Sequence, residues 1–178
     1  MRTVEDGPNQ CAGALISPIH VLTSSSCMSR DIRWATIGLH FSNGTQDGER
    51  IKVVAMITHL KYKDYSNDFM VLELEKPSTF KPVALAAADD SGIGTGERVR
   101  EVQSADVKFM SSEKCSKMAM QWCVRMDSRT KTHAGSPVIV KPSNGDQSAE
   151  DVLVGAVSWG LDCNAANVTS VLAWVSSA

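Results

Sequence analysis

Five cysteines and four histidines are the residues of this sequence that most readily take part in chemistry. Cys11 and Cys27 lie 16 residues apart, Cys115 and Cys123 lie 8 apart, and Cys163 stands alone. No CxxC pair and no Cys/His cluster has the spacing of metal ligands. The spacing therefore predicts two disulfides, Cys11–Cys27 and Cys115–Cys123, with Cys163 unpaired and no metal or cofactor site.

Two Asn-X-Thr patterns, beginning at Asn43 and Asn167, are candidates for N-linked glycosylation. Both disulfides and N-glycans belong to secreted proteins. However, no basic segment followed by an apolar segment comes after Met1, so no secretory signal is visible. We interpret this combination as a secreted protein with a truncated start.

Length and charge restrict the class of protein. A chain of 178 residues corresponds to one large domain or two small ones. With 18 Lys and Arg against 20 Asp and Glu, the formal net charge of −2 argues against binding to nucleic acid or to an anionic membrane. The hydrophobic fraction of 43% is typical of globular proteins, and no apolar run approaches the ~20 residues of a membrane span.

The cysteines and histidines must be positioned by the secondary structure. The sequence contains short runs of β-branched and apolar residues, and turn-forming residues separate these runs. Many short strands at such spacing predict an all-β barrel or sandwich. A serine-capped segment over 111–120 predicts one short helix, and the Gly-, Asp- and Ala-rich stretch 86–97 predicts a linker. The predicted strands are Ala14–Ile16, Ile19–Leu22, Trp34–Leu39, Ile51–Ile57, Phe69–Leu74, Val99–Met110, Val138–Val140, Val152–Val157 and Val168–Val175.

Four motifs occur in the order in which chymotrypsin-like serine proteases carry them. The sequence therefore resembles this family, which implies a trypsin-like double six-stranded β-barrel. The resemblance places the first barrel at about 1–85, the linker at about 86–98 and the second barrel at about 99–178. The motifs are Cys11–Ser17 followed by His20–Cys27, then Asn67–Leu74, Ala134–Ile139 and Val157–Gly160.

The resemblance places the catalytic triad of the family at Ser26, Asp68 and Ala134. Ser26 stands where the family has its general-base histidine, and Ala134 where it has its serine nucleophile. A methyl group cannot attack a carbonyl, and the remaining aspartate has no imidazole to orient. Thr132 also replaces the glycine that carries an oxyanion donor. We therefore predict that the chain is not an enzyme, and we interpret His133 as non-catalytic.

Remnants of a specificity pocket are also implied by the resemblance. Asp127-Ser128 resembles the pair that marks a trypsin-type pocket, but only with one extra residue before Ala134; otherwise Ser128 takes the floor position. Ser158-Trp159-Gly160 resembles the pocket wall. This wall could offer an edge for pairing with a partner loop. Packing of Trp159 in the core is the competing interpretation.

Several loops resemble those of the glucanase inhibitor proteins of oomycete plant pathogens. This resemblance implies a secreted effector that binds and inhibits a host plant endo-β-1,3-glucanase in the apoplast and so suppresses the release of defence-eliciting glucan fragments. The alternative is a truncated, non-inhibitory paralogue that acts as a decoy or binds another protein. The loops are Gly38–Val54, Leu74–Ser78, Ala88–Ser91 and Val175–Ala178.

The barrels are predicted to be incomplete when the sequence is compared with the family pattern. The first strand of the first barrel, one strand of the second barrel and the C-terminal helix, which would follow Ala178, have no counterpart. Missing strands leave sheet edges exposed and barrels open. We therefore expect marginal thermal stability.

Overall fold

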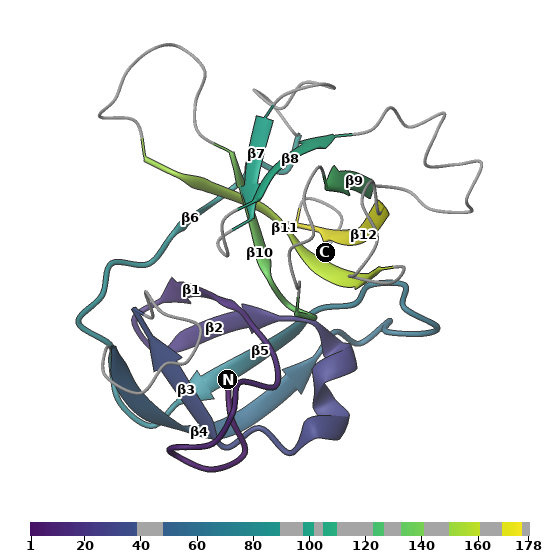
Figure 1. Cartoon of the computed structure of the whole chain (residues 1–178). Helices are drawn as coiled ribbons and strands as arrows, with labels where there is room; N and C mark the ends of the chain where they lie inside the picture. The colour runs from purple at the N-terminus through teal and green to yellow at the C-terminus, as the bar shows by residue number, and fades with distance from the viewer. Residues whose placement is uncertain are drawn as a thin grey trace.

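The structure, a computed structural model, describes residues 1–38, 48–89, 98–101, 105–109, 123–126, 133–140, 150–160 and 169–175. This part of the chain forms twelve strands and one short 3-10 helix, arranged as two sheets (Figure 1). The prediction of an all-β fold is therefore confirmed. Among the described residues, no helix is both long enough and apolar enough to span a membrane.

The first sheet is antiparallel, with the strand order β1-β2-β5-β4-β3. Successive side chains of a strand point to opposite faces, and β5 accordingly buries Met70, Leu72 and Leu74 while the residues between them are partly exposed. These side chains pack with Ile51 of β4 and Ala35 of β3 in one hydrophobic core. The strands are β1 (Ala14–Ser17), β2 (His20–Thr23), β3 (Trp34–Ile37), β4 (Glu49–Thr58) and β5 (Met70–Leu74).

The N-terminal segment lies against the outer edge of β3. Arg2 forms a backbone bridge with Trp34, and its carbonyl accepts the Trp34 N–H at 3.0 Å. On the other side, the Met1 carbonyl accepts the Gln10 N–H at 2.8 Å. Two residues thus connect the edge of β3 to the chain that leads into β1. Their hydrogen bonds satisfy edge groups that an open barrel would expose.

The second sheet contains seven of the described strands, in the order β10-β7-β8-β9-β12-β11-β6. Because β10 pairs with both β7 and β11, the strands from β7 to β12 close into a ring of six. β6 pairs in parallel with β11 outside this ring, although it lies at the end of the predicted first barrel. The strands are β6 (Ala84–Leu85), β7 (Arg98–Glu101), β8 (Ala105–Phe109), β9 (Cys123–Met126), β10 (Pro137–Val140), β11 (Val152–Gly160) and β12 (Thr169–Trp174).

The ring differs from two expectations for the second barrel. The sequence predicts one continuous strand over Val99–Met110 and one missing strand, whereas β7 and β8 are separate strands that pair antiparallel. Arg98 lies opposite Lys108 and Glu101 opposite Ala105, so the chain reverses between Glu101 and Ala105. The ring reaches six strands through this hairpin and through β9, a strand that the sequence did not predict.

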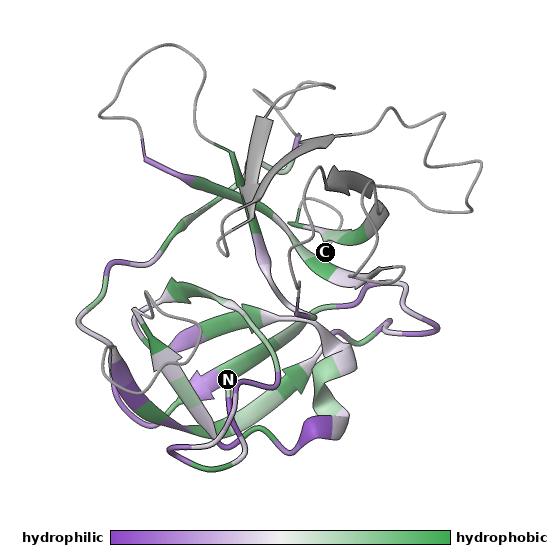
Figure 2. Ribbon diagram, in the orientation of Figure 1, coloured by the Kyte–Doolittle hydropathy of each residue, from purple (hydrophilic) through white to green (hydrophobic). Residues whose placement is uncertain are grey.

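The two sheets meet through a second hydrophobic core. Leu22 and Phe69 of the first half pack in it with Leu153, Ala156 and Ala173 of the second. Figure 2 shows apolar residues concentrated on the strands, while the connections carry more hydrophilic residues. Side chains from β2, β5 and β11 are therefore held close together, which is where the candidate site lies.

Candidate functional site

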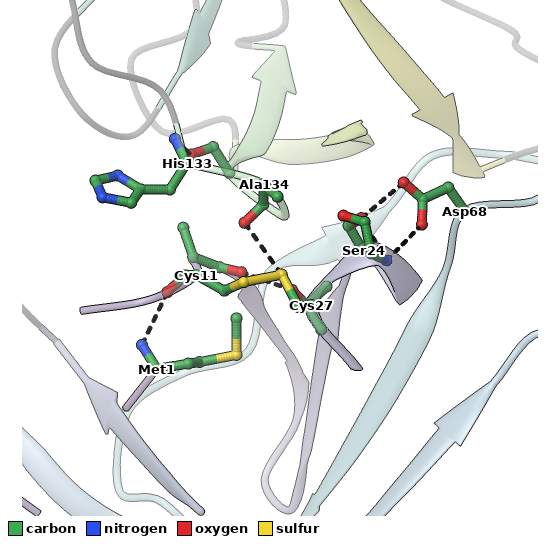
Figure 3. The surroundings of a disulfide bond; sticks show 11 residues. Met1, Cys11, Ser24, Cys27, Asp68, His133 and Ala134 are labelled. Carbon is green, nitrogen blue, oxygen red and sulfur yellow. Dashed lines mark hydrogen bonds between the residues drawn. A yellow bond between two sulfur atoms is a disulfide. The ribbon is translucent and has the colours of Figure 1, made fainter. Parts of the chain in front are cut away.

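Asp68 is a fully buried carboxylate two residues before β5, next to the junction of the sheets. Ser24 Oγ donates to its Oδ2 at 2.7 Å, and the Ser26 N–H donates to its Oδ1 at 3.0 Å. The Ser158 hydroxyl, from β11 of the other sheet, also donates to Oδ2. A buried charge is costly unless it is hydrogen-bonded, and these three donors supply that compensation. Figure 3 shows Ser24 and Asp68 facing each other.

The serines before Cys27 form the short helix η1 (Ser25–Arg30) and its cap. Ser24 is the N-cap, and its extended backbone turns the hydroxyl toward the helix start. Ser24 and Ser26 Oγ atoms lie 2.5 Å apart. Because Ser24 gives its single proton to Asp68, Ser26 must be the donor of this pair. The resulting chain, from Ser26 through Ser24 to Asp68, contains only hydroxyls, which do not accept protons at neutral pH as an imidazole does.

Ala134 lies on a tight turn that is held between the two sheets. Its carbonyl accepts the Ala12 N–H at 3.0 Å, and the next residue, Gly135, donates its N–H to the Val157 carbonyl at 2.7 Å. Gly135 has φ of +81°, and a Cβ there would lie 2.1 Å from Thr23 Oγ1, so only glycine fits. The turn thus has a defined position beside Ser24 and Asp68, but the side chain of Ala134 offers only a methyl group.

The expected disulfide between Cys11 and Cys27 is present and lies under this turn (Figure 3). Both cysteines are buried, and Cys27 Sγ lies 3.6 Å from the Ala134 carbonyl oxygen. The Met1 amino group donates to the Cys11 carbonyl at 2.9 Å. Burial, with a smaller contribution from the Arg2 charge, lowers the pKa of this amino group to about 5.

The predicted pocket wall lies beside the carboxylate. Ser158 is buried and bonded to Asp68, whereas Trp159 is only half-buried. The Trp159 ring contacts Tyr65, with ring centroids 6.1 Å apart and planes tilted by 50°. Gly160 ends β11, opposite Ser170 of β12. Ser158 is therefore part of the buried junction of the sheets, whereas Trp159 is partly exposed beside Tyr65.

Other predicted residues cannot be placed at the site. Cys123 begins β9, but its expected partner lies outside the described residues, as do most of the other candidates. The part of the chain that the structure describes contains no group of three His, Cys, Asp or Glu that could hold a metal ion. The predictions outside the described residues concern Asn43, most of the linker at 86–98, the helix at 111–120, Cys115, Asp127, Ser128, Thr132, Cys163 and Asn167.

Three residues of the site were missed by sequence reasoning. Ser24, rather than Ser26, presents its hydroxyl to Asp68. Tyr65 contacts Trp159, and burial together with the nearby Asp68 carboxylate raises the pKa of Tyr62. Only two tyrosines occur in the whole chain, both within six residues of Asp68, and this clustering could have marked the segment.

Known proteins resemble this chain in sequence. The Trypsin family matches residues 2–178. Glucanase inhibitor protein 1 of Phytophthora sojae is 37% identical over 204 residues, which cover 99% of this chain and 78% of that protein. Glucanase inhibitor protein 3 of Phytophthora infestans is 36% identical, covering 99% and 81%. A trypsin of Simulium vittatum is 27% identical, covering 92% and 75%.

Solved structures show the same fold. The chain matches kallikrein-related peptidase 10 in complex with Zn2+ with a TM-score of 0.73 and 18% identity, covering 99% of this chain and 93% of that one. The predicted resemblance to trypsin-like proteases and to the glucanase inhibitor proteins is therefore confirmed.

Proposed function

This chain belongs to the trypsin family, and we propose that it is a proteolytically inactive member that binds and inhibits a glucanase. The observation that carries this proposal is the identity of 37% and 36% to two glucanase inhibitor proteins, each over 99% of the chain. The trypsin is only 27% identical. Inhibition by binding requires a stable surface rather than a reactive group.

The absence of proteolysis follows from the residues that we assign to the former triad, namely Ser26, Asp68 and Ala134. Asp68 is buried and fully hydrogen-bonded, so it serves the structure without an imidazole to orient. Ser26 has a hydroxyl in place of a base, and Ala134 has no atom that can form an acyl intermediate. The chain could therefore hold a protein without cleaving it.

We further propose that the target is a host plant endo-β-1,3-glucanase and that the protein acts outside the cell, in the apoplast. The buried Cys11–Cys27 disulfide supports an oxidising compartment, since such bonds are rare in the reducing cytosol. Inhibition there would suppress the release of defence-eliciting glucan fragments. N-linked glycosylation at Asn43 and Asn167 would accompany secretion of the chain.

Two assays on the purified chain test the proposal. The first measures laminarin hydrolysis by a plant endo-β-1,3-glucanase with and without the chain, and inhibition that saturates with added chain is expected. The second measures cleavage of peptide and ester substrates, and no turnover above that of a denatured sample is expected.

Each assay can contradict a separate part of the proposal. A glucanase that retains full activity at saturating chain and does not bind to it would exclude the inhibitor role. Peptide or ester turnover that copurifies with the folded chain would exclude the inactive site. A double variant, Ser26→His with Ala134→Ser, restores the histidine and serine at the assigned triad positions. Its turnover of peptide and ester substrates is compared with any trace of turnover by the unchanged chain.

A further inference from the structure

The loop between β4 and β5, residues His59–Asn67, projects from the first sheet and borders the buried site through Tyr65, which contacts Trp159 (Figure 1). We call it the 59–67 loop. Leu60 is fully exposed, and Tyr65 is more than half exposed. Lys61 and Lys63 are exposed as well. The apolar side chain of Leu60 therefore lies in solvent, where a partner can contact it.

Despite its exposure, the loop has a defined shape. The Tyr62 N–H donates to the His59 carbonyl at 2.9 Å, and the Ser66 N–H donates to the Lys63 carbonyl at 2.8 Å. Asn67 Nδ2 donates to the Lys61 carbonyl at 3.2 Å. These bonds close the loop on itself at both ends. A loop that is ordered before binding loses less entropy when it meets its partner.

Backbone strain is concentrated in the same loop. Asp64, Tyr65 and Asn67 have φ of 48°, 64° and 50°, the left-handed region that non-glycine residues seldom adopt. For a bulky aromatic residue this conformation is a clear outlier. The Tyr65 ring lies beside Trp159, with the ring centroids 6.1 Å apart. Strain of this kind persists where it serves a binding or catalytic arrangement.

The positive charge and the apolar surface of the loop are complementary to the substrate cleft of a glycoside hydrolase. Most such enzymes carry a pair of Asp or Glu residues in the cleft that binds the sugar chain. Ligand clefts are otherwise lined largely by apolar and aromatic side chains. The loop presents two exposed ammonium groups, Lys61 and Lys63, and one exposed carboxylate, Asp64, beside the apolar Leu60. Its formal net charge is therefore +1 (2 − 1), whereas the chain as a whole has −2.

We propose that the 59–67 loop enters the substrate cleft of the partner glucanase, with Leu60 against its apolar wall and Lys61 and Lys63 at its catalytic carboxylates. This inference rests on the proposed function and adds the mode of inhibition. Occupation of the cleft excludes the glucan, so inhibition is competitive: it raises KM for laminarin and leaves kcat unchanged.

The test compares loop variants of the full chain with matched controls, using a plant endo-β-1,3-glucanase and laminarin. Leu60→Ser removes the apolar contact, and Lys61→Gln with Lys63→Gln removes the charges. Each is expected to raise the inhibition constant about tenfold or more. The controls are Val4→Ser, an exposed apolar residue of the N-terminal segment, and Lys76→Gln, an exposed charge beyond the opposite end of β5. Both should inhibit like the unchanged chain.

Thermal melts and ionic strength complete the experiment. Because the changed side chains are exposed, all variants should melt at the temperature of the unchanged chain. Salt should weaken inhibition by the unchanged chain and by Leu60→Ser, but hardly that by the double lysine variant, since salt screens exposed charges.

The outcomes separate the inference from the function on which it rests. If the unchanged chain inhibits but the loop variants inhibit equally well, or if inhibition is not competitive, the loop is not the inhibitory element and the proposed function stands. If the unchanged chain neither binds nor inhibits the glucanase, both proposals fail. Loss of inhibition in the loop variants alone, with the controls unaffected, establishes the loop as the inhibitory element.

Discussion

Two carboxylates in this protein accept hydrogen bonds from the same kinds of donor, two hydroxyls and one backbone N–H each, but they lie in different surroundings. Asp68 accepts from the hydroxyls of Ser24 and Ser158 and from the Ser26 N–H. It is fully buried where the two sheets meet. Its donors come from distant parts of the chain, so the carboxylate holds these parts together.

Glu49, at the start of β4, is bound by the hydroxyls of Ser78 and Thr79 and by the Thr79 N–H at 3.0 Å. Its contacts with Thr79 are exposed to solvent, and both donors come from one short connection. Water can replace these donors at Glu49 but not at Asp68. The comparison teaches that burial, rather than the number of hydrogen bonds, decides how much such a carboxylate contributes to stability.

The largest effect is expected from Asp68→Ala. The change leaves two buried hydroxyls and one N–H without their acceptor, and it should lower the free energy of unfolding by about 3 kcal/mol or more. Urea denaturation measures the loss. Asp68→Asn, which keeps one oxygen acceptor, should lose less. Equal losses for Asp68→Ala and Glu49→Ala would contradict the role assigned to burial.

A smaller effect is expected when a single donor is removed. Ser158→Ala deletes one hydroxyl from Asp68 and should lower the free energy of unfolding by about 1–2 kcal/mol. The matched change at the surface, Thr79→Ala, deletes one hydroxyl from Glu49 and should cost about 0.5 kcal/mol or less. The denaturant midpoints of the two variants, measured side by side, give the two losses of stability. A larger loss for Thr79→Ala than for Ser158→Ala would contradict the role assigned to burial.

The exposed 59–67 loop can be compared with the buried carboxylate in the same way, with binding measured beside stability. Tyr65→Gly relieves the left-handed strain at Tyr65, so stability should stay unchanged or rise by up to about 1 kcal/mol. The same change removes the ring that contacts Trp159, and inhibition of the glucanase should weaken. Melting and inhibition are measured on the same sample. A marked loss of stability would show that the strain is not stored at this residue.

The smallest effect concerns the response of Glu49 to acid. The Ser78 hydroxyl, followed by Thr79, lowers the pKa of Glu49 below its ordinary 4.5. Stabilisation by this contact is therefore present above pH 4.5 and is lost as the pH falls through the lower folded value. The difference in free energy of unfolding between the unchanged chain and Glu49→Gln should be about 0.5 kcal/mol or less at neutral pH and should disappear in acid. A difference that persists in strong acid would have another cause.

Much of the first sheet could be predicted because its strands follow a local pattern. The alternation through Phe69–Leu74 predicts β5 to within one residue. The hairpin of β7 and β8 could not be predicted in this way. Residues 101–105 contain no glycine or proline, so the sequence carries no turn signal there, and pairing with β9 and β10 establishes the two strands.

The candidate site was predicted only in part. Asp68 and Ala134 followed from motifs, but the serine that reaches Asp68 did not. Three serines stand in a row before Cys27, and which hydroxyl meets a carboxylate 44 residues away depends on where η1 begins. Long-range contacts of this kind have no signature in the neighbouring sequence.

The sequence by itself determined which functional groups exist: a methyl at Ala134, hydroxyls at Ser24 and Ser26, and two lysines between β4 and β5. These are covalent facts, and no folding changes them. The tertiary structure alone decided which groups are buried, as Asp68 is, and which are held outward, as Leu60 is. The physical reason is that solvation and hydrogen-bond partners depend on segments brought together from distant parts of the chain.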